Sequence, residues 1–228
     1  MLDGRIAVGL LVALLASACG PQPRRWEYRP NAYAPATATT GKVVVLPYRD
    51  ARPDDNTNLI GMYLLPFLPW GWTEQQVPEK EDYHLTSSRW LSYKPVDDYP
   101  KALVADLQSA GLFSNASFAP SEGDADYVVQ GTIVRTEYDG RLWSYGLGPA
   151  GPMLWLFALP AASASNTLAV ELSCTDRRSG RQILSKRYAP PRYDSRSNLY
   201  ARESDFEFAA LLAIVNREFT EDLRGALR

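Results

Sequence analysis

The stretch Tyr127–Tyr138 reads Tyr-Val-Val-Gln-Gly-Thr-Ile-Val-Arg-Thr-Glu-Tyr and is typical of one long β-strand. Valine, isoleucine, threonine and tyrosine dominate it, and these residue types fit a pleated, half-buried surface. Asp139-Gly140 follows at once and predicts a tight turn. A Gly-containing loop at 176–180 predicts a β-hairpin further along. In all, four other segments have strand character: Lys42–Tyr48, Phe113–Ala119, Thr167–Thr175 and Arg181–Tyr188.

Two further segments predict helices. The first opens at Asp97-Asp98-Tyr99-Pro100, where an Asp can cap the helix and Pro100 fits the first turn, and it ends at Gly111. The second is Glu203–Leu227, whose hydrophobic residues recur on one face. This order of elements predicts a single α/β domain over 42–228, of mixed α+β type. We expect an about five-stranded mixed sheet with two main helices packed on it.

Residues 1–18 have the features of an export signal. Arg5 precedes a mostly apolar run over 6–18 that ends in small residues. The run has signal-peptide length and is shorter than a membrane-spanning helix, which needs about 20 residues. Two cleavage sites remain open. Ala16-Ser17-Ala18 fits an ordinary signal peptidase site. Leu15-Ala16-Ser17-Ala18-Cys19-Gly20 resembles the bacterial lipobox, in which the cysteine becomes the first residue of the mature chain and is acylated.

Acylation of Cys19 would make residues 19–41 a lipidated tether, because this segment is rich in Pro, Ala, Thr and Arg. Its aromatic residues, Trp26, Tyr28 and Tyr33, are expected on the domain surface or at the lipid interface. Gly20 stands where enteric lipoproteins retained at the inner membrane carry Asp, so the resemblance implies the outer membrane, facing the periplasm.

The only other cysteine is Cys174, which alternates with hydrophobic residues and is expected in the core as a small apolar side chain. The alternative is a Cys19–Cys174 disulfide in an oxidising compartment. With Cys19 acylated, Cys174 has no partner within the chain.

Two apolar loop insertions rich in Pro, Gly and Trp interrupt the predicted sheet: Leu59–Trp72, within the longer insertion 57–95, and residues 142–165. Their Gly and Pro residues and short apolar runs do not fit a segment that crosses a bilayer. They either form a satellite core with the sheet or present a surface to a partner or a membrane, since Trp and Tyr favour interfaces. The candidate surface residues are Trp70, Trp72, Trp143, Tyr145, Trp155 and Phe157.

No catalytic site and no cofactor are predicted. Gly146-x-Gly148-x-x-Gly151 matches the dinucleotide fingerprint, and Glu171 follows at a suitable distance. However, Pro149 and Pro152 prevent the helix that this fingerprint must open.

No metal site is predicted either. His84 is the only histidine, so a site with several histidines cannot form. Asp50, Asp54 and Asp55 lack the spacing of a calcium loop and are expected in a solvated turn. The net charge is −2 and no long stretch is strongly basic, so a nucleic-acid partner is not expected.

Three short motifs resemble one family. They are Val43-Val44-Val45-Leu46-Pro47-Tyr48, Ala125-Asp126-Tyr127-Val128-Val129-Gln130-Gly131, and Asp176 with Ser179-Gly180. With the lipobox, this pattern over about 42–188 resembles bacterial envelope lipoproteins with the fold of the TolB amino-terminal domain and the curli-secretion lipoprotein. The resemblance implies a non-enzymatic assembly or scaffolding role, often through homo-oligomers. Both apolar insertions and the length of 57–95 depart from the pattern.

We therefore expect an outer-membrane lipoprotein that is attached to the membrane through Cys19 and contacts an envelope protein or a second copy of itself. The alternative is a periplasmic module that binds a lipid or a glycan with its aromatic loops. A hydrolase with paired carboxylates is a third possibility that the sequence leaves open.

Overall fold

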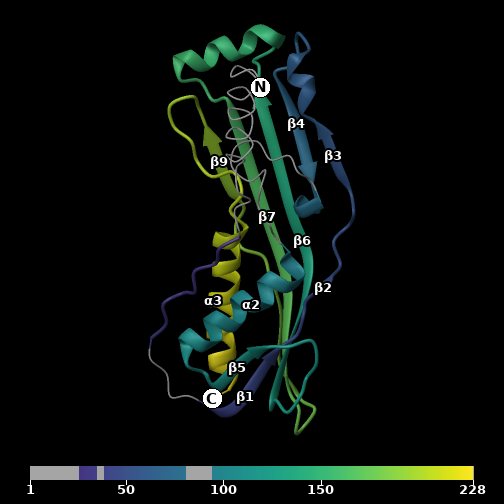
Figure 1. Ribbon diagram of the computed structural model, residues 1–228, viewed down its shortest axis with the longest axis vertical. Helices are drawn as coiled ribbons and strands as arrows, with labels where there is room; N and C mark the ends of the chain where they lie inside the picture. The colour runs from purple at the N-terminus through teal and green to yellow at the C-terminus, as the bar shows by residue number, and fades with distance from the viewer. Residues whose placement is uncertain (1–25, 35–38, 81–93, 228) are drawn as a thin grey trace, which may run out of the picture.

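Two long antiparallel strands run the length of the molecule. β6 (Tyr127–Trp143) and β7 (Ala162–Asp176) pair along almost their full length. The protein is described by a computed structural model over residues 26–34, 39–80 and 94–227, and these two strands follow the long axis of an elongated shape (Figure 1). The strands on either side of this pair complete one sheet.

The sheet is mixed, as predicted, but it has nine strands instead of about five. We call the part that bears the two long helices the lower half and the opposite part the upper half (Figure 1). β1 is parallel to β5 and β6, and β2 is parallel to β6, while the remaining pairings are antiparallel. The strands beside β6 and β7 are β1 (Thr39–Val45), β2 (Arg49–Asp50), β3 (Asn56–Leu59), β4 (Trp70–Gln75), β5 (Phe113–Phe118), β8 (Gln182–Tyr188) and β9 (Tyr193–Ser197).

The four missed strands, β2, β3, β4 and β9, lie in segments that were expected to be turn, insertion or loop. In β4 the buried positions are Gly71, Thr73 and Gln75, whereas the two tryptophans of the strand are only half-buried. The hydrophobic residues of β4 therefore lie on its more exposed face, so a search for hydrophobic alternation does not find its buried face. The predicted turn at Asp139-Gly140 is also wrong, because β6 continues through it and Gly140 pairs on both sides within the sheet.

The main core lies in the lower half, where α2 (Pro95–Ala110) and α3 (Phe208–Ala226) pack on one face of the sheet. This confirms two main helices. Both begin away from the predicted residues. α2 starts two residues before Asp97, with Pro95 in its first turn, and Asp98 accepts a hydrogen bond from the Lys94 N–H at 2.7 Å. Gly111, at φ 61°, ends α2 as predicted.

Residues 26–34 lie against this core instead of extending from it. The Tyr28 hydroxyl and the Asn216 amide donate to the buried carboxylate of Asp106, and the Asn31 N–H donates to it at 2.7 Å. Burial, followed by the contact with Asp106, raises the pKa of the Tyr28 hydroxyl. The described part of the expected tether is therefore packed on the domain, and β1 begins at Thr39, inside the range expected for the tether.

A bulge in β6 between Ile133 and Arg135 marks the junction of the two halves. Beside it, the guanidinium of Arg52 is 1% exposed and binds Asp50, Glu79 and the Thr136 hydroxyl. Burial alone lowers the pKa of Arg52, but the hydrogen bonds to Asp50 and Glu79 outweigh it and raise that pKa. Asp50 thus belongs to an ion-pair cluster that joins β2, β6 and the segment after β4, not to a solvated turn.

Candidate functional site

Three loop segments meet at the upper end of the molecule. They are residues 59–69, with the short helix η1 (Ile60–Leu64), residues 144–160, with η3 (Gly148–Phe157), and residues 198–200. The Phe67 N–H donates to the Gly146 carbonyl at 2.8 Å, and the Tyr200 hydroxyl donates to the Leu156 carbonyl at 2.8 Å. We call these three segments together the apolar end (Figure 1).

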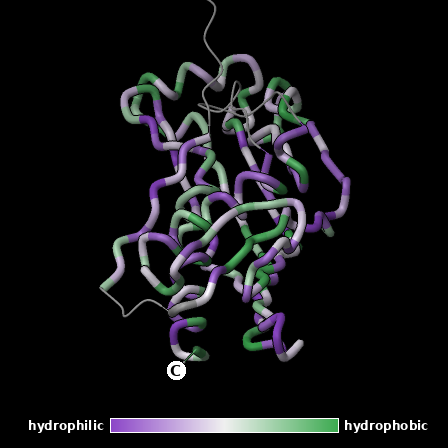
Figure 2. The backbone as a smooth tube through the Cα atoms, turned by 60° about the horizontal axis from the view of Figure 1, so that its bottom comes forward, coloured by the Kyte–Doolittle hydropathy of each residue, from purple (hydrophilic) through white to green (hydrophobic). Residues whose placement is uncertain are grey.

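The apolar end carries every exposed large hydrophobic side chain of the described residues. Phe67 is 93% exposed and Phe157 is 77% exposed, which is unusual for a monomer in water. Green, hydrophobic stretches accordingly mark the upper corners of the backbone in Figure 2. The full set is Leu59, Leu64, Leu65, Phe67, Leu147, Met153, Leu156, Phe157, Leu159, Leu199 and Tyr200.

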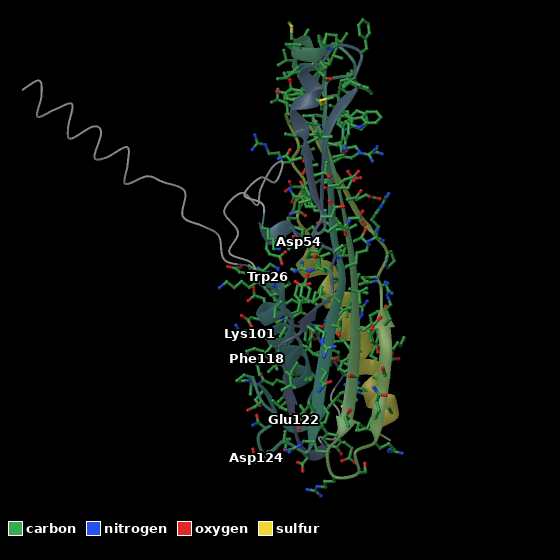
Figure 3. The ribbon with its side chains drawn as sticks, turned by 90° about the vertical axis from the view of Figure 1, so that its right-hand side faces the viewer. Trp26, Asp54, Lys101, Phe118, Glu122 and Asp124 are labelled. Atoms are coloured by element: carbon green, nitrogen blue, oxygen red, sulfur yellow. The ribbon has the colours of Figure 1, made fainter. Side chains whose placement is uncertain are left out.

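Charge is absent from the two long segments of this end. Residues 59–73 and 142–170 contain no Asp, Glu, Lys or Arg. Charged residues are frequent instead at the opposite end, where Glu122 and Asp124 lie (Figure 3). The two long segments at this end therefore contrast with the charged opposite end.

The structure brings most of the predicted surface residues together just below the apolar end. The rings of Trp70 and Trp143 are 5.0 Å apart, and Tyr145 lies 6.0 Å from Trp143. The Trp155 indole N–H donates to the Trp143 carbonyl at 2.9 Å. All of these aromatic residues are half-buried, and so is Trp72, two positions along β4 from Trp70. They form an aromatic cluster that supports the exposed residues above it.

The insertions contain both half-buried and exposed residues, so burial separates them residue by residue. The tryptophans and Tyr145 act as a satellite core, whereas Phe157 is freely exposed. Sequence reasoning missed Phe67, Met153 and Leu156 as surface residues, because it weighted Trp and Tyr over other hydrophobic residues. The absence of charge over 59–73 and 142–170 is the signal that could have found them.

A cleft of about 560 Å³ adjoins the aromatic cluster. Arg141 and Trp143 line it from β6, and they alternate with Tyr138, whose side chain is in the core, so the cleft lies on the face opposite the helices. Arg141 pairs with Asp139 at 3.1 Å, and Arg192 pairs with Asp194 at 2.9 Å. The cleft is thus polar, with an aromatic wall towards the apolar end.

The two carboxylates that line this cleft are each paired with an arginine. A general acid needs a carboxyl group whose pKa is raised. Here the hydrogen bond from Ser165, with help from Arg192, lowers the pKa of Asp194. Asp139 is held by Arg141. Among the described residues, no group of three His, Cys, Asp or Glu side chains could hold a metal ion.

The glycines of the dinucleotide-like motif have a packing role. A Cβ on Gly151 would lie 2.3 Å from the Ser144 carbonyl oxygen, and one on Gly148 would lie 2.7 Å from the Leu64 carbonyl oxygen. These glycines therefore allow η3 to approach η1 and the end of β6. Gly148 and Gly151 belong to the 3₁₀-helix η3, not to the start of an α-helix, and Glu171 is exposed in mid-strand.

Several predicted residues lie elsewhere. Cys19, His84 and the signal segment 1–18 are outside the described residues. Cys174 is fully buried in the main core, and this burial raises the pKa of its thiol to about 12. No helix in the described part of the chain is long and apolar enough to span a bilayer.

Neither a family model nor a curated protein matches the chain. Among solved structures, the chain is similar to a Xanthomonas campestris protein of family DUF330, with 12% identity, a TM-score of 0.44, and coverage of 89% of this chain and 92% of that one. A PelC dodecamer from Paraburkholderia phytofirmans has 15% identity and a TM-score of 0.34 over 86% and 94% of the two chains. A lipoprotein from Neisseria meningitidis has 12% identity and a TM-score of 0.30 over 78% and 96%.

None of these three proteins is described as a TolB or curli-secretion protein, so the resemblance to those two remains a prediction. At such low TM-scores the neighbours carry no argument about what this chain does. Its function has to be argued from its own residues.

Proposed function

We propose that this chain is a non-enzymatic envelope lipoprotein that uses its apolar end as a contact surface. One observation carries the proposal: every exposed large hydrophobic side chain among the described residues lies in the three segments of this end. Large exposed apolar patches mark interaction sites in soluble proteins, because leaving them in water is unfavourable. In the part of the chain that the structure describes, the Cys174 thiol is fully buried and the carboxylates of the cleft are paired with arginines.

The sequence supports the membrane attachment in this proposal. The lipobox-like segment ending at Cys19 supports acylation, and Gly20 supports the outer membrane, with the domain in the periplasm. The TolB-like and curli-secretion-like pattern over 42–188 supports an assembly or scaffolding role, with an envelope protein or a second copy as partner. Mass analysis of the mature protein tests the attachment: we expect a chain that starts at an acylated Cys19. A free thiol at Cys19, or a different first residue, would contradict this part.

The contact surface is tested by photo-crosslinking in intact cells. A benzophenone amino acid replaces the exposed Phe157 in one strain and the exposed Ser121, at the opposite end, in a matched control. We expect adducts with an envelope component from position 157 and none from position 121. Equal adducts at both positions, or none at 157, would show that the apolar end is not a contact surface.

A lipid- or glycan-binding role is the second candidate. The cleft favours it, since Trp143 and Tyr145 form an aromatic wall beside polar Arg, Asp and Ser side chains. Native mass spectrometry of the purified protein distinguishes it: a bound lipid or sugar that is lost on Arg141→Ala would favour this candidate, and a ligand-free protein would count against it.

A further inference from the structure

We propose that the apolar end enters the interfacial layer of a lipid bilayer. This inference rests on the proposed function, which makes the apolar end a contact surface, and it names the occupant of that surface. Four features of the described residues favour lipid over a protein partner or a second copy: the high exposure of the side chains, the internal pairing of several polar groups, the lack of charge along the two long segments, and the polarity of the neighbouring cleft.

The exposed Phe67, Phe157 and Met153 do not line the cleft; of the exposed large hydrophobic side chains described above, only Leu159 does. Phe67 occupies the left-handed region at φ 72°, which residues with a side chain rarely adopt, and its N–H is fixed to the Gly146 carbonyl. Phe157 and Met153, on the other segment, are 77% and 65% exposed. Separate protruding hydrophobic side chains can enter lipid, which adapts to their shape, whereas a protein partner needs shape complementarity.

Several polar side chains of the apolar end are paired within the protein. The Tyr145 hydroxyl donates to the Pro160 carbonyl at 2.7 Å, and the Tyr200 hydroxyl donates to the Leu156 carbonyl at 2.8 Å. The Trp155 indole N–H likewise donates to the Trp143 carbonyl. Lipid offers few hydrogen bonds, so such internal pairing is what insertion requires.

Backbone groups of the apolar end also form hydrogen bonds within the protein. Both η1 and η3 are 3₁₀-helices, in which each carbonyl accepts from the N–H three residues later. Proline also removes N–H groups that would need a partner. The prolines of the two long segments are Pro66, Pro69, Pro149, Pro152 and Pro160. These segments are too short to span a bilayer, but they can enter its interfacial layer.

On the two long segments, charges are set back from the exposed side chains by a distance that fits a shallow insertion. Along β6, Arg141 comes two residues before Trp143, about 7 Å at strand spacing. An interfacial segment typically enters lipid by about 5–10 Å. With the side chains above Trp143 in the acyl region, the tryptophans lie at headgroup level, where they are favoured, and Arg141 faces the headgroups.

A second copy of the chain is a poorer occupant. The cleft of about 560 Å³ carries the charged side chains of Asp139, Arg141, Arg192 and Asp194 beside its aromatic wall. A smaller hollow of about 290 Å³ beside Trp70 and Trp72 also carries Glu74 and Arg141, so neither is a purely apolar seat for Phe67 or Phe157 of another molecule. Lipid, in contrast, is held beside the domain by the acylation predicted at Cys19.

The test uses the processed, acylated chain reconstituted in vesicles of phosphatidylethanolamine and phosphatidylglycerol. A nitrobenzoxadiazole fluorophore is attached at Phe157→Cys, with Phe67→Cys as a second position and Ser121→Cys as the matched control. Cys174 is fully buried, so the native protein is labelled only at the introduced cysteine once Cys19 is acylated. Lipids with a nitroxide near the headgroup end of the acyl chain serve as quenchers.

We expect a blue-shifted emission and several-fold stronger quenching at positions 157 and 67 than at 121. Equal quenching at all three positions, or probes that remain in water, would overturn the membrane inference. If the probe at 157 stays in water while the crosslinker at 157 still traps a protein in cells, the contact surface stands and its occupant is that protein. If position 157 neither traps a component nor is quenched, both proposals fail.

Discussion

The lower and upper halves of the β6–β7 pair use their residues in opposite ways. In the lower half, α2 and α3 cover the sheet and bury large side chains such as Phe219 and Leu212. In the upper half, many fully buried positions are small or polar, among them Thr73, Gln75 and Asn166, while the large hydrophobic residues are exposed. This comparison teaches that hydrophobic composition alone does not locate the core: here, the most apolar segments of the described chain lie outside it.

The two halves should therefore respond differently to the same mutation. Phe219 is fully buried and meets the Tyr188 ring edge-on at 6.0 Å. We expect Phe219→Ala to lower the free energy of unfolding by about 3–5 kcal/mol, because it leaves a cavity. Urea denaturation of the purified protein measures this. Phe157→Ala is the matched control, with an expected loss below about 0.5 kcal/mol. Similar losses of unfolding free energy in the two variants would contradict the proposed difference between the halves.

Polar contacts should hold the upper half more than hydrophobic packing does. The Asn166 amide is fully buried and donates to the Asp205 carbonyl at 2.9 Å. We expect Asn166→Ala to cost about 1–3 kcal/mol of unfolding free energy, because it leaves a buried backbone group without its partner. Asn115→Ala, at an exposed position of β5, is the control and should change little. A loss at Asn166 no larger than at Asn115 would contradict this view.

The stabilisation that the Arg52 ion-pair cluster gives to the junction between the halves should depend on pH. The hydrogen bonds from Arg52 lower the pKa of Asp50, so the stabilisation from this carboxylate is complete above its usual pKa of about 3.9 and is lost as the pH falls through the lowered value. We expect Asp50→Asn to cost less than about 1 kcal/mol near neutral pH, since Asp50 is partly exposed and screened by water. Urea midpoints of the two proteins should converge as the pH falls below about 3.9 and through the lowered pKa of Asp50. A difference that stays constant or grows on acidification would show that Asp50 does not act through its charge.

The smallest effect should come from the apolar end itself. Phe67 is 93% exposed and has a positive φ, which glycine adopts more easily. We expect Phe67→Gly to leave the unfolding free energy unchanged or to raise it by up to about 0.5 kcal/mol. Phe157→Gly, within η3, should instead lower it by about 0.5–1 kcal/mol. Thermal denaturation compares the pair, and a clear loss at Phe67 would mean that this side chain packs within the fold.

Much of the lower half could be predicted from the sequence. β1, β5, β8, α2 and α3 follow from local patterns of hydrophobic residues, turn residues and caps, and the structure contains all of them, although α3 begins at Phe208 instead of Glu203. The upper half could not be predicted in this way. β4 and β9 bury Gly, Thr, Gln and Ser, so their alternation carries no hydrophobic signal, and the turn signal at Asp139-Gly140 is overridden by pairing with strands on both sides. The contacts of residues 26–34 with Asp106 span too much sequence for any local pattern to indicate them.

By itself, the sequence determined the mixed α/β class, the two helices, and the presence of two charge-free aromatic segments, because these follow from local residue pattern and composition. Only the tertiary structure decided that these segments meet at one end, with the tryptophans half-buried and Phe67 and Phe157 exposed. The physical reason is that burial depends on which strands pair across long sequence separations. The identity of a hydrophobic residue does not by itself determine whether the folded protein covers it or leaves it exposed.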